Sequence, residues 1–186
     1  LIYSIGVSVD GFINDRDGDF QWAPPDQELF DFHTQEVGKL GAYLLGRRLY
    51  EDMRVWETDP AMRDSRPEFA DIWAELPKVV FSRTLEAVEG NARLAESSVE
   101  EETRAVLSAT DADVQIGGAD LAGQAFELGL LDELRIFRYP VVVGGGTPHL
   151  PAVTAGVPLD LLETREFPSR VVYERYVRSR AGRSSG

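Results

Sequence analysis

The sequence predicts an α/β fold: a mixed, mostly parallel sheet with helices on both faces and an antiparallel hairpin at its C-terminal end. Short apolar runs alternate with helical segments through the first two-thirds of the 186 residues. Strand-like runs then follow one another without an intervening helix. Because no repeat or linker interrupts this pattern, we expect one domain over residues 1–178, and a flexible tail or cloning remnant over residues 179–186.

The composition narrows the classes of function. Hydrophobic residues make up 43% of the chain, enough for a packed core, and the formal net charge of −13 disfavours binding to nucleic acid or anionic membranes. The absence of cysteine excludes disulfides, thiolate catalysis and cysteine-based metal sites. No apolar run is long enough to span a bilayer, and no secretory signal is recognisable. We therefore expect a cytoplasmic protein that acts on a small molecule.

The first third of the chain predicts a buried strand, a loop and a helix. Residues 1–9 are β-rich and apolar, and Asp10-Gly11 marks a turn into the polar loop 14–18. Asp26 is suited to cap a helix that runs to about Val37. Its apolar face carries Leu29, Phe30, His33 and Val37.

The rest of the chain alternates between strands and helices before it becomes all-β. Strands are predicted from alternation and β-branched residues, and helices from their 3.6-residue period, with Gly129 ending the last helix. Pro168-Ser169 predicts a tight hairpin between the final strands. The strands are expected at residues 42–45, 78–81, 114–116, 134–143, 159–167 and 171–177. The helices are expected at residues 47–53, 68–75 and 98–109, and a last helix follows Gly117-Gly118 and runs to about Leu128.

Three of the predicted strands end in residues suited to holding phosphate: Gly46-Arg47-Arg48, Ser82-Arg83-Thr84 and Gly117-Gly118. Carboxyl ends of parallel strands meet at one edge of a sheet, where open α/β folds bind ligands. Glycine lets a ligand approach the backbone, a helix N-terminus offers unpaired N–H groups, and arginine grips phosphate with two hydrogen bonds. Together the segments predict a dinucleotide site.

Each segment also has a purely structural interpretation. Gly117-Gly118 is then only a tight turn, Arg47 and Arg48 are solvated surface side chains, and residues 82–84 are a polar strand exit. The glycine spacing matches neither the Rossmann fingerprint nor a P-loop. The dinucleotide prediction therefore depends on the three segments lying together.

Five motifs occur in order along the chain: residues 8–13 (SVDGFI), 45–51 (LGRRLYE), 80–84 (VFSRT), 116–121 (IGGADL) and 140–148 (PVVVGGGTP). Together they resemble the dihydrofolate reductase-like family, and most closely its branch that contains the C-terminal reductase domain of bacterial riboflavin biosynthesis. The resemblance reaches to about Val177. It implies a three-layer fold, a reductase that uses NADPH, and a homodimer that pairs through its sheets.

The resemblance also implies where NADPH lies. Its phosphates contact Gly46, Arg47 and Arg48, although Leu49 stands where a threonine is common and one hydroxyl contact is lost. An arginine beside the adenosine ribose favours NADPH over NADH. We expect the Asp120 side chain to point away from the pyrophosphate and cap its helix. The adenosine set is Ser82, Arg83 and Thr84, the pyrophosphate set is Gly117, Gly118, Ala119, Asp120, Leu121 and Ala122, and the nicotinamide set is Val7, Ser8, Asp10 and Ile13.

Hydride transfer also requires a proton, and two aspartates are candidate catalytic residues. Asp10 lies next to the expected nicotinamide, or is only the first residue of an Asp-Gly turn. Asp26 loosely matches the acid of dihydrofolate reductases, or is only a helix N-cap, and Glu28 and Asp31 compete for the same role. Riboflavin-type reductases lack that acid, so water is the alternative proton source.

Several aromatic residues, a glycine-rich segment and the two histidines are weaker candidates for a functional role. Phe20, Trp22 and Trp56 either line a substrate cleft or belong to the core. Residues 144–148 either flank a ligand or form a flexible turn. His33 is expected to pack in the core, and two distant histidines without an acidic cluster predict no metal site.

The sequence therefore predicts an NADPH-dependent reductase that resembles 5-amino-6-(5-phosphoribosylamino)uracil reductase. Hydride would go to a small heterocyclic or ribosylamino substrate. Two alternatives stay open: a non-catalytic nucleotide-binding module on the same scaffold, and a pterin or folate reductase. The latter requires a buried carboxylate in the helix after Pro25.

Overall fold

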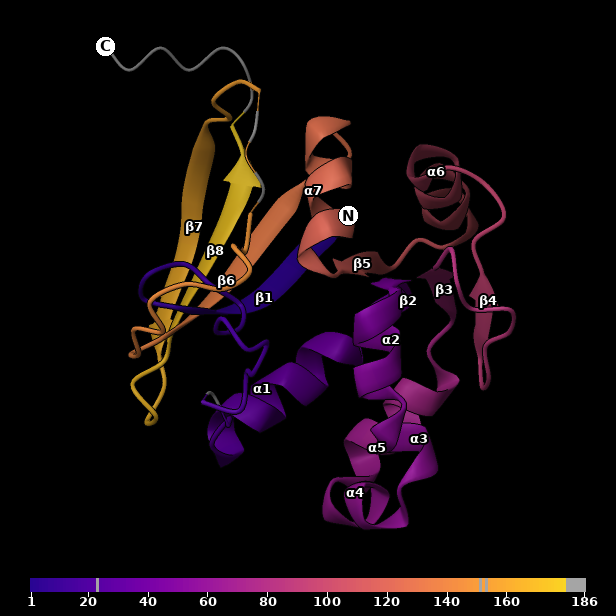
Figure 1. The fold of residues 1–186 in the computed structure, drawn as a ribbon, viewed down its shortest axis with the longest axis horizontal. Coiled ribbons are helices and arrows are strands. Elements are labelled where there is room, and N and C mark those ends of the chain that lie inside the picture. Colours follow the sequence, from indigo (N-terminus) through magenta and orange to yellow (C-terminus); the bar gives the residue numbers. More distant parts are fainter. Residues whose placement is uncertain (23, 151, 153, 180–186) are drawn as a thin grey trace.

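An eight-stranded sheet runs through the molecule in the computed structural model (Figure 1). The structure describes residues 1–22, 24–150, 152 and 154–179, so the expected tail lies, apart from Ser179, outside the described residues. The sheet has the order β4-β3-β2-β5-β1-β6-β8-β7. Its strands are β1 (Ile2–Ser8), β2 (Leu40–Gly46), β3 (Lys78–Phe81), β4 (Ala92–Leu94), β5 (Asp113–Gly117), β6 (Glu133–Tyr139), β7 (Leu159–Glu166) and β8 (Val172–Arg178).

Helices cover both faces of the sheet, which confirms the three-layer α/β fold. Figure 1 shows α6 and α7 on one side and the other helices on the opposite side. None of the helices within the described residues combines the length and apolarity that crossing a membrane requires. The helices are α1 (Gln27–Val37), α2 (Arg47–Met53), α3 (Val55–Thr58), α4 (Pro60–Ser65), α5 (Pro67–Glu75), α6 (Val99–Ala109) and α7 (Ala119–Glu127).

The strands from β4 to β6 are parallel, and the last two strands are antiparallel to their neighbours. β1 lies between β5 and β6, although β2 follows it in the chain. The predicted hairpin at Pro168-Ser169 joins β7 to β8, with Arg170 in the left-handed region (φ 64°).

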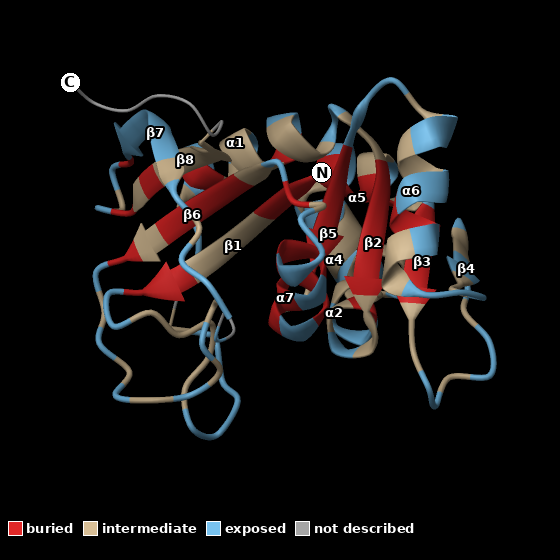
Figure 2. Ribbon diagram, turned by 90° about the horizontal axis from the view of Figure 1, so that it is seen from above, coloured by how far each residue is buried: buried red, intermediate tan, exposed pale blue. Residues whose placement is uncertain are grey.

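Two cores lie on opposite faces of the central strands because side chains alternate along a strand. In β2, Ala42 and Leu44 belong to the core beneath α6 and α7, whereas Tyr43 and Leu45 belong to the core beneath α2 and α5. A third cluster packs α1 against β6 and β8. Figure 2 shows that β2 and β5 are buried over most of their length.

Caps position the helices, and two of them, at Asp26 and Gly129, were predicted. Asp26 caps α1 by accepting a hydrogen bond from the Leu29 backbone N–H (2.8 Å). Ser98 and Glu101 form a capping box at the start of α6. Gly129, with φ +70°, follows the last residues of α7 and permits the turn there.

The structure corrects the sequence-based elements at several points. The strand expected over residues 134–143 ends at Tyr139, because Pro140 lacks an N–H group and a tight turn joins the Val141 N–H to the Tyr139 carbonyl (2.8 Å). The short elements α3, α4 and β4 were not predicted, since three to six residues are too few for a periodic signal.

The pH dependence of stability tests the packing of His33. Its ring lies 4.4 Å from the Phe137 ring centroid, and burial lowers the pKa of His33 to about 4, partly offset by Glu36. Because this folded-state pKa lies below the unfolded value, His33 supports folding above about pH 6.5, and the contribution falls as the pH drops toward 4. Urea titrations should show that wild type loses about 1 kcal/mol more than His33→Phe between pH 7 and pH 5.5. Equal losses in both proteins would contradict this assignment.

Candidate functional site

The three phosphate-suited segments lie side by side on one edge of the sheet. β3, β2, β5 and β1 are adjacent in that order and parallel, so their carboxyl ends form a single rim. Register aligns Gly46 with Phe81, the last residue of β3, and Leu45 with Gly117. The order of the segments along the rim is residues 82–84, residues 46–48, Gly117-Gly118 and the exit of β1.

The strands β2 and β5 form a topological switch point. From β2 the chain continues outward to β3, whereas α7 carries it from β5 across to β6. Ligands bind at such points because the two connections diverge and leave a crevice. Here the divergence brings Gly46 close to Gly118: a Cβ on Gly118 would lie 3.7 Å from the Gly46 backbone nitrogen.

The two glycines at the end of β5 have different roles. A Cβ on Gly117 would overlap Leu49 Cδ2 and lie 2.8 Å from the Tyr43 ring, so this glycine makes room for packing. Gly118 has φ +99°, and a Cβ added there would make only ordinary contacts with the Gly46 backbone, so its backbone conformation rather than lack of space requires glycine. The structural interpretation of this pair therefore applies to Gly117, whereas Gly118 remains a candidate for ligand binding.

No side chain within the described residues caps the N-terminus of α7. Asp120 accepts a hydrogen bond from Gln124 Nε2 (3.1 Å), one turn along the helix, so the expected Asp120 cap is wrong. Its carboxylate stays exposed and leaves the helix amides to other partners. The remaining side chains of this segment, those of Ala119, Leu121 and Ala122, are buried, so only their backbone can meet a ligand.

The arginines on the rim differ in their partners. Arg47 pairs with Glu51 (3.0 Å) along α2. Arg48 and Arg83 are exposed, and neither forms an ion pair or side-chain hydrogen bond with the described residues. The Ser82 hydroxyl accepts the Thr84 and Leu85 backbone N–H groups (3.1 and 2.9 Å), which fixes the turn that carries Arg83.

The last residues of β1 are not accessible to a ligand. Val7 and Ser8 are fully buried, and the Ser8 hydroxyl accepts the Phe12 backbone N–H (3.0 Å). The predicted Asp10-Gly11 turn is present, with Gly11 at φ +88°. Ile13, half-buried, is thus better placed than Val7 or Ser8 to touch a ligand beside β1.

Neither candidate acid is set up to hold a proton at neutral pH. The Ser8 hydroxyl and the backbone N–H groups of Gly144 and Val143 lower the pKa of Asp10. The backbone N–H of Leu29, with Ser169, lowers the pKa of Asp26, so its N-cap role is confirmed. The competing carboxylates are engaged as well: Glu28 pairs with Arg165 (2.7 Å), and Asp31 accepts from Gln27 Nε2 (2.6 Å).

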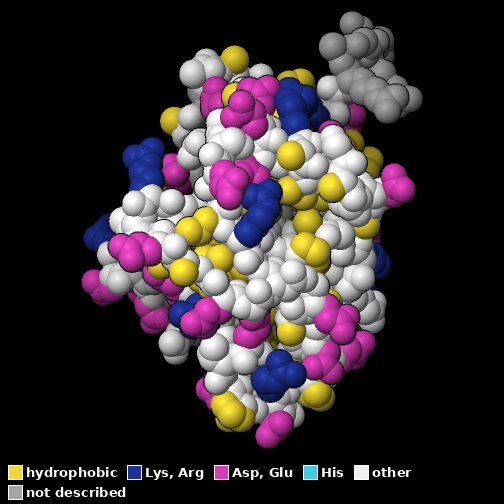
Figure 3. All heavy atoms as spheres, turned by 90° about the vertical axis from the view of Figure 1, so that its right-hand side faces the viewer, with side chains coloured by type: hydrophobic (Ala, Val, Ile, Leu, Met, Phe, Trp, Pro, Cys, Tyr) yellow, Lys and Arg dark blue, Asp and Glu magenta, His cyan; other side chains and the backbone are white. Residues whose placement is uncertain are grey.

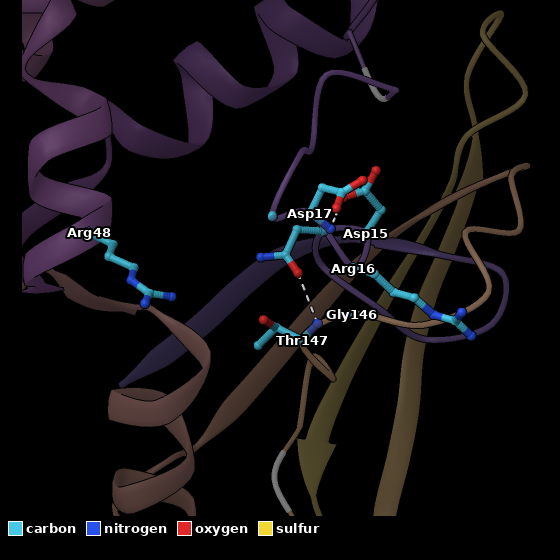
Figure 4. Close-up of a pocket in the computed structure, with 8 residues that line it drawn as sticks. Asp15, Arg16, Asp17, Arg48, Gly146 and Thr147 are labelled. Atoms are coloured by element: carbon cyan, nitrogen blue, oxygen red, sulfur yellow. Dashed lines mark hydrogen bonds between the residues drawn. The ribbon is translucent and has the colours of Figure 1, made fainter.

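An open groove of about 430 Å³ lies between the rim and two loops. Arg48 extends toward it from α2, and the opposite wall comes from the loops after β1 and β6 (Figure 4). Asn14 and Thr147 are joined across these loops by a 2.9 Å hydrogen bond. The sequence predicts only a polar loop at residues 14–18, because nothing local indicates which segment they contact. The groove is lined by Asn14, Asp15, Arg16, Asp17, Gly18, Arg48, Gly146 and Thr147.

The other candidates divide between core and surface. Trp56 packs against Phe69 (4.8 Å between ring centroids) and belongs to the core, whereas Phe20 is 54% exposed. Trp22 packs edge-on against Tyr139. Among the residues that the structure describes, no group of three or more acidic or histidine side chains is arranged to hold a metal ion. Acidic and basic side chains are interspersed on the face next to β4 (Figure 3).

Comparison with known proteins gives one family and a consistent set of folds. The family model described as the RibD C-terminal domain matches residues 1–173. A Bacillus subtilis (strain 168) protein described as uncharacterized, YyaP, is 30% identical over 175 residues, which are 92% of this chain and 91% of YyaP.

Among solved structures, a candidate riboflavin biosynthesis protein from Shewanella sp. PV-4 has a TM-score of 0.79 at 19% identity, covering 96% of this chain and 98% of that one. The Thermotoga maritima diaminohydroxyphosphoribosylaminopyrimidine deaminase/5-amino-6-(5-phosphoribosylamino)uracil reductase has a TM-score of 0.67 at 18% identity. The alignment covers 96% of this chain and 56% of the Thermotoga chain. At these identities the likeness establishes the shared fold.

The packing role of Gly117 predicts a double-mutant result. Gly117→Ala should destabilise the protein by about 1–3 kcal/mol, because the new methyl group overlaps Leu49 and crowds Tyr43. In a Leu49→Ala background the same change should cost less, because part of the overlap is gone. Urea unfolding of the four proteins measures the coupling. Additive effects would show that Leu49 does not set the requirement for glycine.

Proposed function

The chain belongs to the RibD C-terminal domain family, and we propose that it is an NADPH-dependent reductase acting on a small heterocyclic or ribosylamino substrate. The observation that carries the proposal is the order of the rim. The resemblance assigns residues 82–84 to adenosine, residues 46–48 and 117–122 to the phosphates, and the exit of β1 to nicotinamide. The spatial order β3-β2-β5-β1 is the order of those parts along an extended dinucleotide.

The dimensions of the rim support this assignment. Neighbouring strands lie about 4.8 Å apart, so β3 and β1 are separated by roughly 14 Å. We expect the phosphates midway, at the switch point between β2 and β5, where the uncapped start of α7 lies beside Gly46 and Gly118. We therefore expect a dinucleotide to lie along the rim with its anionic centre at the backbone amides.

Each residue then has a physical role. The backbone N–H groups after Gly118 would bind the pyrophosphate, and Arg48 would neutralise it from the opposite side. Arg83 would pair with the ribose 2′-phosphate, for which it competes with no described carboxylate. The bound cofactor supplies the hydride, and the protein supplies its orientation.

We assign the proton to water rather than to a carboxylate. Asp10 and Asp26 both have lowered pKa values and are ionised at neutral pH, so neither holds a proton to donate. This also argues against the pterin or folate alternative, because that chemistry requires a buried carboxylate in α1. The carboxylates in the first half of the helix cap it or pair on the surface, and Glu36, which is partly buried, is paired with Arg135 and Lys39.

Two arginine variants separate the parts of the cofactor. Arg83→Ala should weaken NADPH binding roughly tenfold or more and leave NADH binding almost unchanged, because only NADPH carries the 2′-phosphate. Arg48→Ala should weaken both cofactors by similar factors, because both carry the pyrophosphate. Fluorescence titration of each protein with each cofactor measures these effects.

The matched control is Arg104→Ala, which removes the same charge from the exposed face of α6. It should bind both cofactors like wild type. Equal losses in Arg83→Ala and Arg104→Ala would show that net charge, rather than the rim, governs affinity.

Turnover distinguishes the enzyme from the alternatives. With NADPH and a pyrimidine ribosylamine, absorbance at the reduced-nicotinamide band should fall steadily, and with dihydrofolate it should not. Tight binding without turnover over a panel of such substrates would instead identify a non-catalytic nucleotide-binding module.

The proposal includes a homodimer that pairs through the sheet. β7 is an edge strand whose Leu161 and Leu162 are each 54% exposed, and such an edge is suited to association. Sedimentation equilibrium should give twice the chain mass for wild type and a shift toward the monomer for Leu161→Glu. A wild-type protein that stays monomeric at all concentrations would remove this part of the proposal.

A further inference from the structure

Side chains of the loop after β1 form hydrogen bonds to the loop after β6. The proposed hydride transfer does not involve these hydrogen bonds. We call residues 143–147 the glycine loop. The Asp10 carboxylate accepts hydrogen bonds from the backbone N–H groups of Val143 (3.2 Å) and Gly144 (2.8 Å). The Arg16 guanidinium donates to the Gly144 carbonyl oxygen (2.6 Å). Both backbone polar groups of Gly144 are therefore bound by side chains from the other loop.

Further contacts lock the glycine loop in place. The Ile13 N–H donates to the Thr147 carbonyl (2.9 Å), next to the Asn14–Thr147 bond. A Cβ on Gly145 would lie 2.7 Å from Arg16 Nε, and a Cβ on Gly146 would overlap the Asn14 carbonyl oxygen. The glycines thus permit close approach of the two loops, and their φ values of +75° to +142° suit few other residues.

The glycine loop forms part of the groove, whereas Asp10 does not. Gly146 and Thr147 line the groove together with Asn14, opposite Arg48. Asp10 is not a lining residue, and its two carboxylate oxygens are already bound to backbone amides. Figure 4 shows that the side chain of Arg16, which also lines the groove, extends away from Arg48.

We propose that Asp10 is a positioning residue: its carboxylate anchors the glycine loop against residues 13–16 and thereby fixes the groove wall that faces Arg48. The inference rests on the proposed function in one respect, namely that the groove receives the nicotinamide end of the dinucleotide and the substrate. Glycine-rich backbone has little conformational preference of its own, so it depends on external ties. Charge-assisted hydrogen bonds to an ionised carboxylate are the strongest ties available on an exposed loop.

The test uses Asp10→Ala, Asp10→Asn and the control Asp111→Asn, which removes an equal charge from an exposed carboxylate outside the groove. Backbone ¹⁵N order parameters of residues 143–147 should fall from about 0.85 in wild type to below about 0.6 in Asp10→Ala. Asp10→Asn should lie between them, because it keeps one acceptor oxygen and turns an NH₂ group toward an amide donor.

Kinetics give the second measurement. Misplacement of a site by about 1 Å can lower the catalytic rate roughly 100-fold. We therefore expect kcat/KM to fall about 10- to 100-fold in Asp10→Ala, with a higher KM for NADPH or for the ribosylamine. The dependence of kcat on pH should keep its wild-type shape, because a positioning residue takes no part in proton transfer. Asp111→Asn should match wild type in both measurements.

Two results would overturn the inference. One is a glycine loop that stays as ordered in Asp10→Ala and Asp10→Asn as in wild type. The other is a loss of kcat with a missing limb in its pH profile, which would make Asp10 the proton donor. A wild-type protein that binds neither NADPH nor NADH would refute the proposed function separately, and the order parameters would still decide whether Asp10 anchors the loop.

Discussion

The candidate site depends on the placement of β5 between β2 and β1. This insertion makes β2 and β5 neighbours with diverging connections, and it brings Gly46 against Gly118. Glycine is needed at position 118 because its backbone adopts φ +99°, which few other residues tolerate. The same strand order places the turn that carries Arg83 on one side of this point and the loop after β1 on the other.

The groups on the rim differ in charge from the protein as a whole. A chain with a formal charge of −13 repels anions at long range, but salt screens that repulsion over about 10 Å. Arg48 and Arg83 form no ion pair among the described residues, whereas Arg47 is paired with Glu51. Arg48 lies near enough to Asp52 to offset part of the rise that burial causes in the pKa of that carboxyl. The helix amides of α7 lack a side-chain cap, and the Asp120 side chain bonds along the helix. The site therefore keeps its cationic groups available in an acidic protein.

The sequence predicted those parts of the molecule whose signals are local. The cap at Asp26, the strand Lys78–Phe81 and the bounds of α2 follow from residue types and periodicity, and the ordered motifs predicted the fold. Long-range contacts could not be predicted from the sequence. Nothing in residues 14–18 (NDRDG) indicates that Asn14 and Arg16 bind residues 144–147. Nothing around Gly117 in the sequence indicates that Leu49 occupies the space beside it. The Asp120 cap was wrong because Gln124, one turn away, offers its side chain a donor.

The most direct measurement is a crystal structure of the protein with NADPH. We expect adenosine at Ser82–Thr84, the pyrophosphate between Gly46 and the start of α7, and the nicotinamide ring beside Ile13 and the exit of β1. A dinucleotide bound in the reverse direction, or away from the carboxyl ends of β3, β2 and β5, would contradict the proposed site.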